Sequence, residues 1–185
     1  MESTAPTPSK VAIKWAVINV LASIVLTYVF QFLNLALDSP IRYISYVVFI
    51  GLLLLGQKEF RDQLGGFITF GQAFVEGLLF SVFSGIMMCI FTYVYFAILS
   101  PAAWEQVLSA QQTKLEAAGT LSAEQVETAM GVTRKYGVLI SAVFIVIGTP
   151  IMGAIIALIG AAIFKKERSI LDIEQSNDNY TDPAV

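Results

Sequence analysis

Long apolar runs separated by short polar segments dominate the chain. The runs that carry almost no charged residue cover 15–37, 41–57, 77–99 and 138–164. At about 1.5 Å per residue, the first of them spans the roughly 30 Å hydrocarbon core of a bilayer. Apolar runs of this length are typical of membrane-crossing helices. The pattern therefore predicts an all-α integral membrane protein with four transmembrane helices.

The third apolar run is longer than one crossing needs. Between Phe67 and Leu99 the only charged residue is Glu76, and a helix of that length would reach about 50 Å. Tilting accommodates only part of such an excess. We therefore predict an interfacial amphipathic helix at the beginning of this run, about 65–74, followed by a bend and then the third span.

A polar stretch, 100–135, separates the third span from the fourth. Its Ala, Gln and Glu residues favour helix. Pro101 suits the first turn of one helix and Gly119 suits its end, because proline is tolerated at helix starts and glycine at helix ends. Ser122 and Gln125 then have the spacing of a capping box for a second helix. We expect an extramembrane helical hairpin here.

The positions of lysine and arginine predict the orientation. With an even number of spans, three basic clusters lie on the same side of the membrane, which the positive-inside rule assigns to the cytoplasm. Both termini are then cytoplasmic. An N-terminal tail, 1–10, and a disordered C-terminal tail, 169–185, flank a single transmembrane domain, 11–168. The clusters are Lys10 and Lys14, then Lys58 and Arg61, then Lys165, Lys166 and Arg168.

Composition narrows the function classes. Of the 185 residues, 56% are hydrophobic and 14% are charged, whereas soluble domains have about 45–50% and about 25%. The net charge of −3 offers no basic surface for nucleic acid. The chain has no histidine and one cysteine, which excludes histidine-based metal sites and triads. No span pairs a nucleophile with a base, so we expect no catalytic residue, no cofactor, no metal and no enzyme activity.

Glu76 is the most informative single residue. Acids inside membranes are costly and often belong to ion or proton pathways. Gln72 and Glu76 are one helical turn apart, so they share a face. If the preceding residues lie in the interface, Glu76 is near water, where it is solvated or paired with a lysine. We favour that interpretation over a role in transport.

A polar stripe follows the first span. Polar side chains in lipid should face other helices, because an unpaired polar group is costly there. The stripe forms interhelical hydrogen bonds, each worth about 1 kcal/mol or less, or else it lines a polar pathway. We favour the hydrogen bonds. Its members repeat at every fourth position: Asn19, Ser23, Thr27 and Gln31.

Small residues at the same four-residue spacing mark two further helix faces. Such faces allow close approach of two backbones in a membrane. We predict that the third and fourth spans touch through them, although the same pattern serves an oligomer equally well. The faces consist of Ala73, Gly77 and Ser81 in one span and Gly153, Ala157 and Ala161 in the other.

Several segments together resemble a known family. GGFITFGQAF at 65–74 is followed by a long apolar segment that closes with YVYFAILSP at 93–101, then by the polar helical insert, the last span and Lys165-Lys166. This layout resembles the domain of unknown function 4199 family of small bacterial membrane proteins. The resemblance implies a four-helix protein of the bacterial inner membrane. It carries no activity, ligand or catalytic residue.

Two functions follow from these observations. The leading hypothesis is a non-enzymatic structural or accessory membrane protein that acts through helix packing in the lipid bilayer. A homo-oligomer and a membrane-protein partner are both open, and no nucleic acid is expected. The alternative is a small transporter or channel component that uses Glu76 and the polar stripe of the first span.

Overall fold

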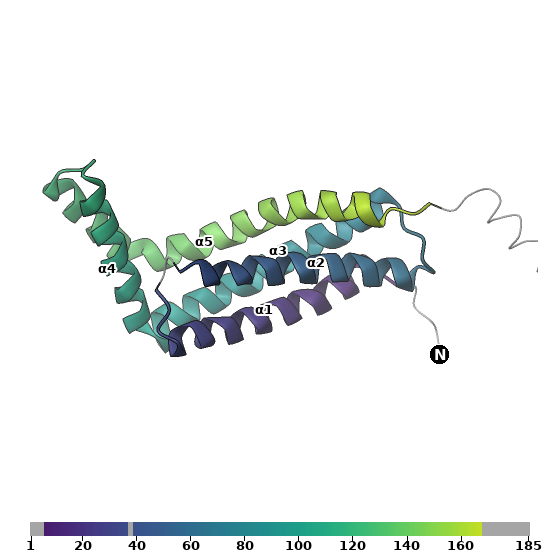
Figure 1. Ribbon diagram of the computed structural model, residues 1–185, viewed down its shortest axis with the longest axis horizontal. Helices are drawn as coiled ribbons and strands as arrows, with labels where there is room; N and C mark the ends of the chain where they lie inside the picture. The colour runs from purple at the N-terminus through teal and green to yellow at the C-terminus, as the bar shows by residue number, and fades with distance from the viewer. Residues whose placement is uncertain (1–5, 37–38, 168–185) are drawn as a thin grey trace, which may run out of the picture.

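The computed structural model describes residues 6–36 and 39–167 and is built of helices. A short 3-10 turn, Pro40–Tyr43 (η1), precedes α2, and a π-helical turn, Tyr95–Leu99 (η2), follows α3. Figure 1 shows α1, α2, α3 and α5 running alternately in opposite directions, with α4 steeply inclined across one end. The main helices are α1 Pro8–Phe32, α2 Ile44–Gln63, α3 Phe70–Val94, α4 Pro101–Ala118 and α5 Ala123–Phe164.

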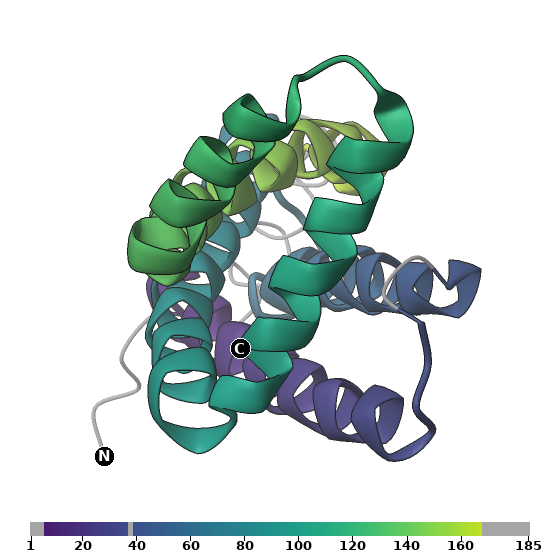
Figure 2. The same ribbon diagram turned by 90° about the vertical axis from the view of Figure 1, so that its left-hand side faces the viewer.

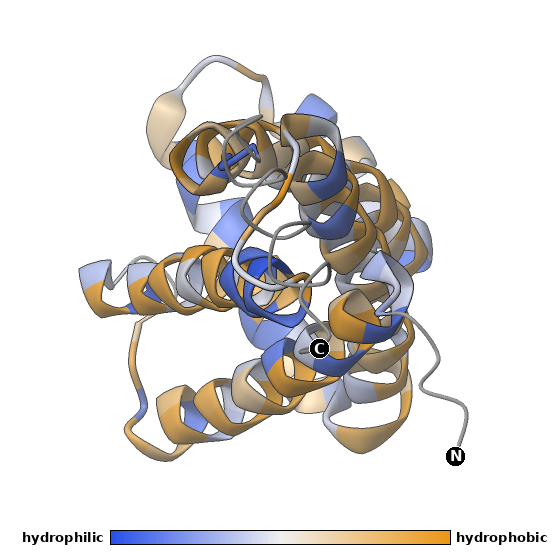
Figure 3. Ribbon diagram, turned by 90° about the vertical axis from the view of Figure 1, so that its right-hand side faces the viewer, coloured by the Kyte–Doolittle hydropathy of each residue, from blue (hydrophilic) through white to orange (hydrophobic). Residues whose placement is uncertain are grey.

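Four of these helices are long and apolar enough to cross a membrane: α1, α2 with η1, α3 with η2, and α5. They are mainly hydrophobic along their lengths, with hydrophilic residues concentrated near their ends (Figure 3). Many large apolar side chains point outward, among them Val25, Ile90 and Phe144. An apolar exterior of this kind suits lipid. The chain is therefore an all-α, multi-pass membrane protein.

Helix α3 is the centre of the bundle. Its most extensive contact is with α5, and it also packs against α1 and α2, while α2 lies against both α1 and α5. One apolar cluster in this centre includes Leu53, Phe80 and Ala157. A second cluster lies near the end where α1 begins and α5 stops, and it includes Val11, Ile68 and Ala161.

The structure corrects the prediction of a separate interfacial helix over 65–74. Gly65 and Gly66 adopt positive φ angles of 79° and 87° in a turn, and Ile68 then forms an antiparallel β-bridge with Lys166. Helix α3 begins directly afterwards, because Thr69 and Gln72 form a capping box. It continues without a break to Val94.

The polar stretch forms two helices with the caps that its residues predict. Gly119 ends α4 in the left-handed conformation, with φ of 61°, and Ser122 caps α5 in a capping box with Gln125. Figure 2 shows α4 and the first turns of α5 joined by this turn at one end of the bundle. The second helix does not stop near residue 135, however. It is the beginning of α5, which continues through Pro150 to Phe164.

Other helix ends also differ from the sequence-based boundaries. Helix α1 begins at Pro8, within the predicted N-terminal tail. Helix α2 continues to Gln63, so Lys58 and Arg61 are helical rather than part of a connector. The predicted tail 169–185 and the last residue of the predicted first span, Leu37, lie outside the described residues.

Candidate functional site

Gln57 joins three helices inside the bundle. Its side chain is fully buried, and Nε2 donates hydrogen bonds to the backbone oxygens of Ala73 on α3, at 2.9 Å, and Ala157 on α5, at 3.0 Å. The missing side chain of Gly160 leaves room for Gln57, because a Cβ at position 160 would lie only 1.8 Å from Gln57 Oε1. Sequence analysis missed this residue. In the sequence, Gln57 is a polar residue at the end of an apolar run, and a polar residue at such a position is usually expected to contact water.

Glu76 lies beside this junction and is completely buried. Neither of its carboxylate oxygens has a hydrogen-bond partner within the described residues. Oε1 approaches the backbone of α2 at Gly56, where a Cβ would lie 2.7 Å from it. The prediction that Glu76 reaches water or pairs with a lysine is therefore wrong. Helix α3 belongs to the bundle from its first residue, Phe70. Glu76, in the second turn of the helix, therefore already lies in the interior.

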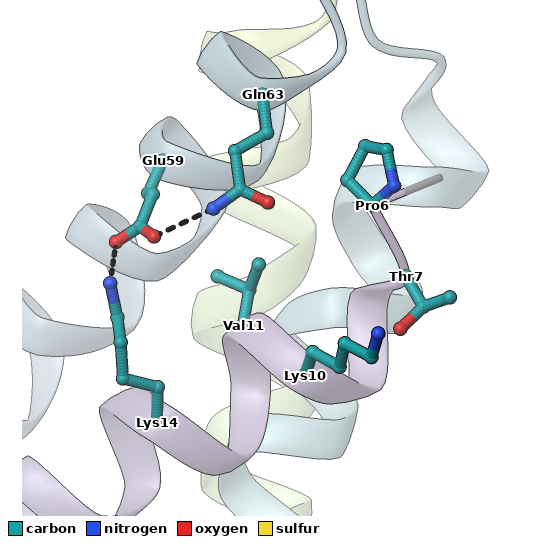
Figure 4. A pocket seen from close by; sticks show the side chains of 7 residues that line it. All are labelled: Pro6, Thr7, Lys10, Val11, Lys14, Glu59 and Gln63. Atoms are coloured by element: carbon teal, nitrogen blue, oxygen red, sulfur yellow. Dashed lines mark hydrogen bonds and ion pairs between the residues drawn. The ribbon is translucent and has the colours of Figure 1, made fainter. Parts of the chain in front are cut away.

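A cleft opens between α1 and α2 at the end of the bundle where α1 begins. Glu59 stands at its edge, with its carboxylate paired to Lys14 Nζ and held by Trp15 Nε1 and Gln63 Nε2, both at 2.8 Å. Figure 4 shows Lys14 and Gln63 converging on this carboxylate. The volume of the cleft is about 440 Å³, and its lining consists of Pro6, Thr7, Lys10, Val11, Lys14, Glu59 and Gln63.

Trp15 connects the cleft to the buried acid. Its indole nitrogen bonds Glu59, while its Cδ1 lies 3.3 Å from the point that a Cβ on Gly56 would occupy. Glu76 Oε1 approaches the same point from α3. Gly56 and Glu59 are three residues apart on α2, so they share one face. The interior acid and the acid at the cleft therefore lie along one side of α2, beside Trp15.

The polar stripe of α1 does not gather into one wall. Asn19 is buried, and its Oδ1 has no partner within the described residues. Thr27 donates to the backbone oxygen of Ser23 in its own helix, at 2.8 Å. Gln31 is exposed and accepts a hydrogen bond from the Tyr95 hydroxyl, at 2.9 Å. Of the stripe, only Asn19 belongs to the core.

Gln72, which shares a helical face with Glu76 by spacing, does not join it in the structure. Its side chain is exposed and completes the capping box with Thr69. The buried amide of this region, Gln57, comes instead from α2. A helical repeat places residues on a face, but the neighbouring helices decide which of them is enclosed.

The small-residue faces of α3 and α5 meet each other. A Cβ on Gly77 would lie 2.7 Å from the Ala157 Cβ, and one on Gly153 would lie 2.1 Å from the Ser81 Cβ. Ala73 and Ala161 are fully buried in the same apolar cluster. These faces are therefore occupied within a single chain, which leaves less of them for a second copy.

Among the described residues, no group of three or more His, Cys, Asp or Glu is placed to hold a metal ion. Comparison with known proteins gives one match. Residues 14–166 match the model of a family described as protein of unknown function (DUF4199). No curated protein and no solved structure matches the chain.

Proposed function

The chain belongs to the DUF4199 family of proteins of unknown function, and from its own residues we propose that it is a proton-handling membrane protein. It acts as a small transporter or channel component in which the Glu76 carboxyl binds the proton. One observation carries this proposal: Glu76 is completely buried on the apolar helix α3, beside Gly56 of α2, and neither carboxylate oxygen has a hydrogen-bond partner within the described residues.

Energetics favours a functional reason for this acid. An unpaired buried carboxylate lowers the stability of the fold by several kcal/mol. Membrane proteins retain such groups mainly where the group has a function. A structural role would need hydrogen bonds. Gln57 Nε2 donates two of them, whereas neither carboxylate oxygen of Glu76 has a hydrogen-bond partner among the described residues. A carboxyl takes up a proton without further ligands, whereas metal cations need several oxygens around them. The proton is therefore the ligand that this site fits best.

The test is flux in liposomes that contain the purified full-length protein. With a pH gradient imposed and valinomycin clamping the potential, we expect the wild-type protein to carry a proton flux that Glu76→Gln lacks. A Na⁺ gradient at equal pH, with K⁺ equal on both sides so that valinomycin still clamps the potential, distinguishes a metal cation from a proton. Equal flux in the two proteins, or none in either, contradicts the proposal.

A second candidate function is the non-enzymatic accessory subunit. The observation that favours it is the placement of α4, which contacts α5 and η2 rather than the rest of the bundle and carries many exposed polar residues. A mild-detergent pull-down from native membranes should then recover a stoichiometric partner. Glu105→Arg combined with Glu116→Arg should lose this partner, while Glu76→Gln should keep it. A lone chain in all three samples contradicts this candidate.

Orientation and location complete the proposal. The alternating helices (Figure 1) bring the described members of the basic clusters, Lys10 and Lys14, Lys58 and Arg61, and Lys165 and Lys166, to one end. The positive-inside rule then puts both termini in the cytoplasm of a bacterial inner membrane. The α4–α5 hairpin lies on the opposite side, outside the bilayer. We expect a reporter that works only in the periplasm to be active when fused after Gln112 and inactive when fused after Gly65. The reverse result inverts the topology.

A further inference from the structure

The enclosed acid needs a route to water, and the structure contains one such route on α2. Glu76 Oε1 lies beside Gly56, and Glu59 lies one helical turn further toward the end of the bundle. Glu59 opens onto the cleft between α1 and α2 and onto a neighbouring cleft of about 480 Å³. Its side chain is 27% exposed, against none for Glu76. Water therefore reaches Glu59 before it reaches Glu76.

We propose that Glu59 is the proton-entry residue for Glu76, that Trp15 positions its carboxylate between the cleft and the buried acid, and that Lys14 keeps this carboxylate charged until a proton arrives. This inference rests on the proposed function of Glu76. In this proposal, protons enter the protein from water through the cleft.

The charged groups around this route come from α1, α2 and α3. Helix α1 contributes Lys10 and Lys14, which line the cleft, and the ammonium of Lys14 pairs with Glu59. Helix α2 contributes Glu59 together with Lys58 and Asp62, which line the neighbouring cleft. Helix α3 contributes only Glu76, and α5 has no charged residue between Lys135 and its end at Phe164. Of the two acids that line these clefts, Glu59 is nearer along α2 to Gly56, which Glu76 approaches, so Glu59 is the acid placed to exchange a proton with Glu76.

The transfer is balanced at each step. A hydronium ion in the cleft gives its proton to a carboxylate oxygen of Glu59, which weakens the ion pair with Lys14. The proton then passes through water that enters beside Trp15 to a carboxylate oxygen of Glu76. Glu59 is left as a carboxylate and regains its bonds to Lys14 and Trp15. No oxidant, reductant or further reactant is needed.

Trp15 has a defined part in this arrangement. Its Nε1 donates to Glu59, and its ring edge covers the backbone of α2 at Gly56, next to Glu76. On the proposed route, water passes between the cleft and Glu76 when this ring moves. Because the ring is tied to Glu59, protonation of Glu59 weakens the bond that holds the ring in place. Entry of the proton and opening of the path are thus coupled through a single hydrogen bond.

The experiment follows the rate at which Glu76 becomes protonated. Full-length protein in lipid is subjected to a rapid pH drop, and the carbonyl stretch of a protonated carboxyl is recorded by time-resolved infrared difference spectroscopy. The band is assigned to Glu76 by its absence in Glu76→Gln. We expect Glu59→Gln to slow the appearance of this band about 100-fold, the usual effect of removing a positioned proton-transfer group.

Three further variants separate proton entry from a structural role. Lys14→Gln breaks the same ion pair but keeps the acid, so it should not slow the band and should speed it, since Glu59 then binds a proton without giving up an ion pair. Glu59→Asp should retain most of the rate. Glu167→Gln removes an exposed acid that pairs with Lys165 just after the end of α5, at 3.2 Å, and should change nothing. Lys14→Gln and Glu59→Asp also test the proposal if Glu59→Gln does not fold.

The outcomes separate this inference from the proposed function. Unchanged kinetics in Glu59→Gln, with the Glu76 band present, overturn the entry role and leave the proposed function of Glu76 standing. Equal slowing in Lys14→Gln and Glu59→Gln shows that the ion pair only holds α1 to α2, and it also overturns the entry role. If no Glu76 band appears at any pH, Glu76 takes up no proton, and both proposals fall.

Discussion

Glu76→Met is expected to stabilise the protein and to abolish proton flux at the same time. Methionine has a similar length and fills the same space without a charge. The wild-type carboxyl is buried without a partner within the described residues, and an unsatisfied buried polar group costs about 1–3 kcal/mol, more when charged. For a chain of this size, each kcal/mol raises Tm by about 2–4 °C. Thermal unfolding in detergent and liposome flux measure the two effects.

The control for this prediction is a carboxyl with an ordinary environment. Glu105 is exposed and pairs with Arg134, so Glu105→Met should change stability by no more than about 0.5 kcal/mol and leave flux intact. A fall in Tm for Glu76→Met would mean that the carboxyl stabilises the fold through contacts. In that case its burial would have a structural rather than a functional reason.

Gly153→Ala is expected to disrupt the bundle. A Cβ at this position would lie 2.1 Å from Ser81 Cβ and 2.5 Å from Ser81 Oγ. Ser81 Cβ is attached directly to the backbone of α3, so the clash is relieved only if α3 and α5 separate along their most extensive contact. Overpacking in a well-filled core costs about 1–3 kcal/mol, occasionally more. We expect a Tm fall of several degrees and a smaller folded fraction after extraction.

Two variants make the Gly153 result interpretable. Gly148 lies on the same helix with nothing within 4 Å of its Cβ position. Gly148→Ala should therefore be neutral or stabilising by up to about 1 kcal/mol, because alanine favours helix. Adding Ser81→Gly to Gly153→Ala removes the atom that clashes and should recover most of the loss. If the double variant is as unstable as the single one, this contact is not the cause.

The site changes how the two functional hypotheses compare. Small-residue faces on α3 and α5 first suggested a protein that acts by association, yet these faces are occupied inside one chain, with Gly77 against Ala157 and Gly153 against Ser81. The hairpin remains a surface for an accessory role. Glu76 and Glu59, by contrast, lie along one side of α2 between the cleft and the interior, and the proposed proton route uses this arrangement.

Part of the candidate site could be predicted from the sequence. Glu76 was singled out because it is the one charge in a long apolar run. An interfacial helix over 65–74 with the third span starting near residue 77 would place Glu76 near water, whereas the Thr69 capping box begins a single bundle helix at Phe70. Gln57 was missed because nothing local distinguishes a buried amide at the end of a span from one that faces water.

The sequence by itself determined the elements. Apolar length specifies the four membrane-crossing helices, and local chemistry specifies several of their ends, as Gly119 and Ser122 demonstrate. Both signals act within a few residues of the chain, so no partner is needed to recognise them. Only the tertiary structure decided that Glu76 is enclosed and that Gln57 joins three helices. Those properties depend on Gly56 and Gly160, glycines on other helices that leave room for the two side chains, and such contacts arise only when distant segments pack together.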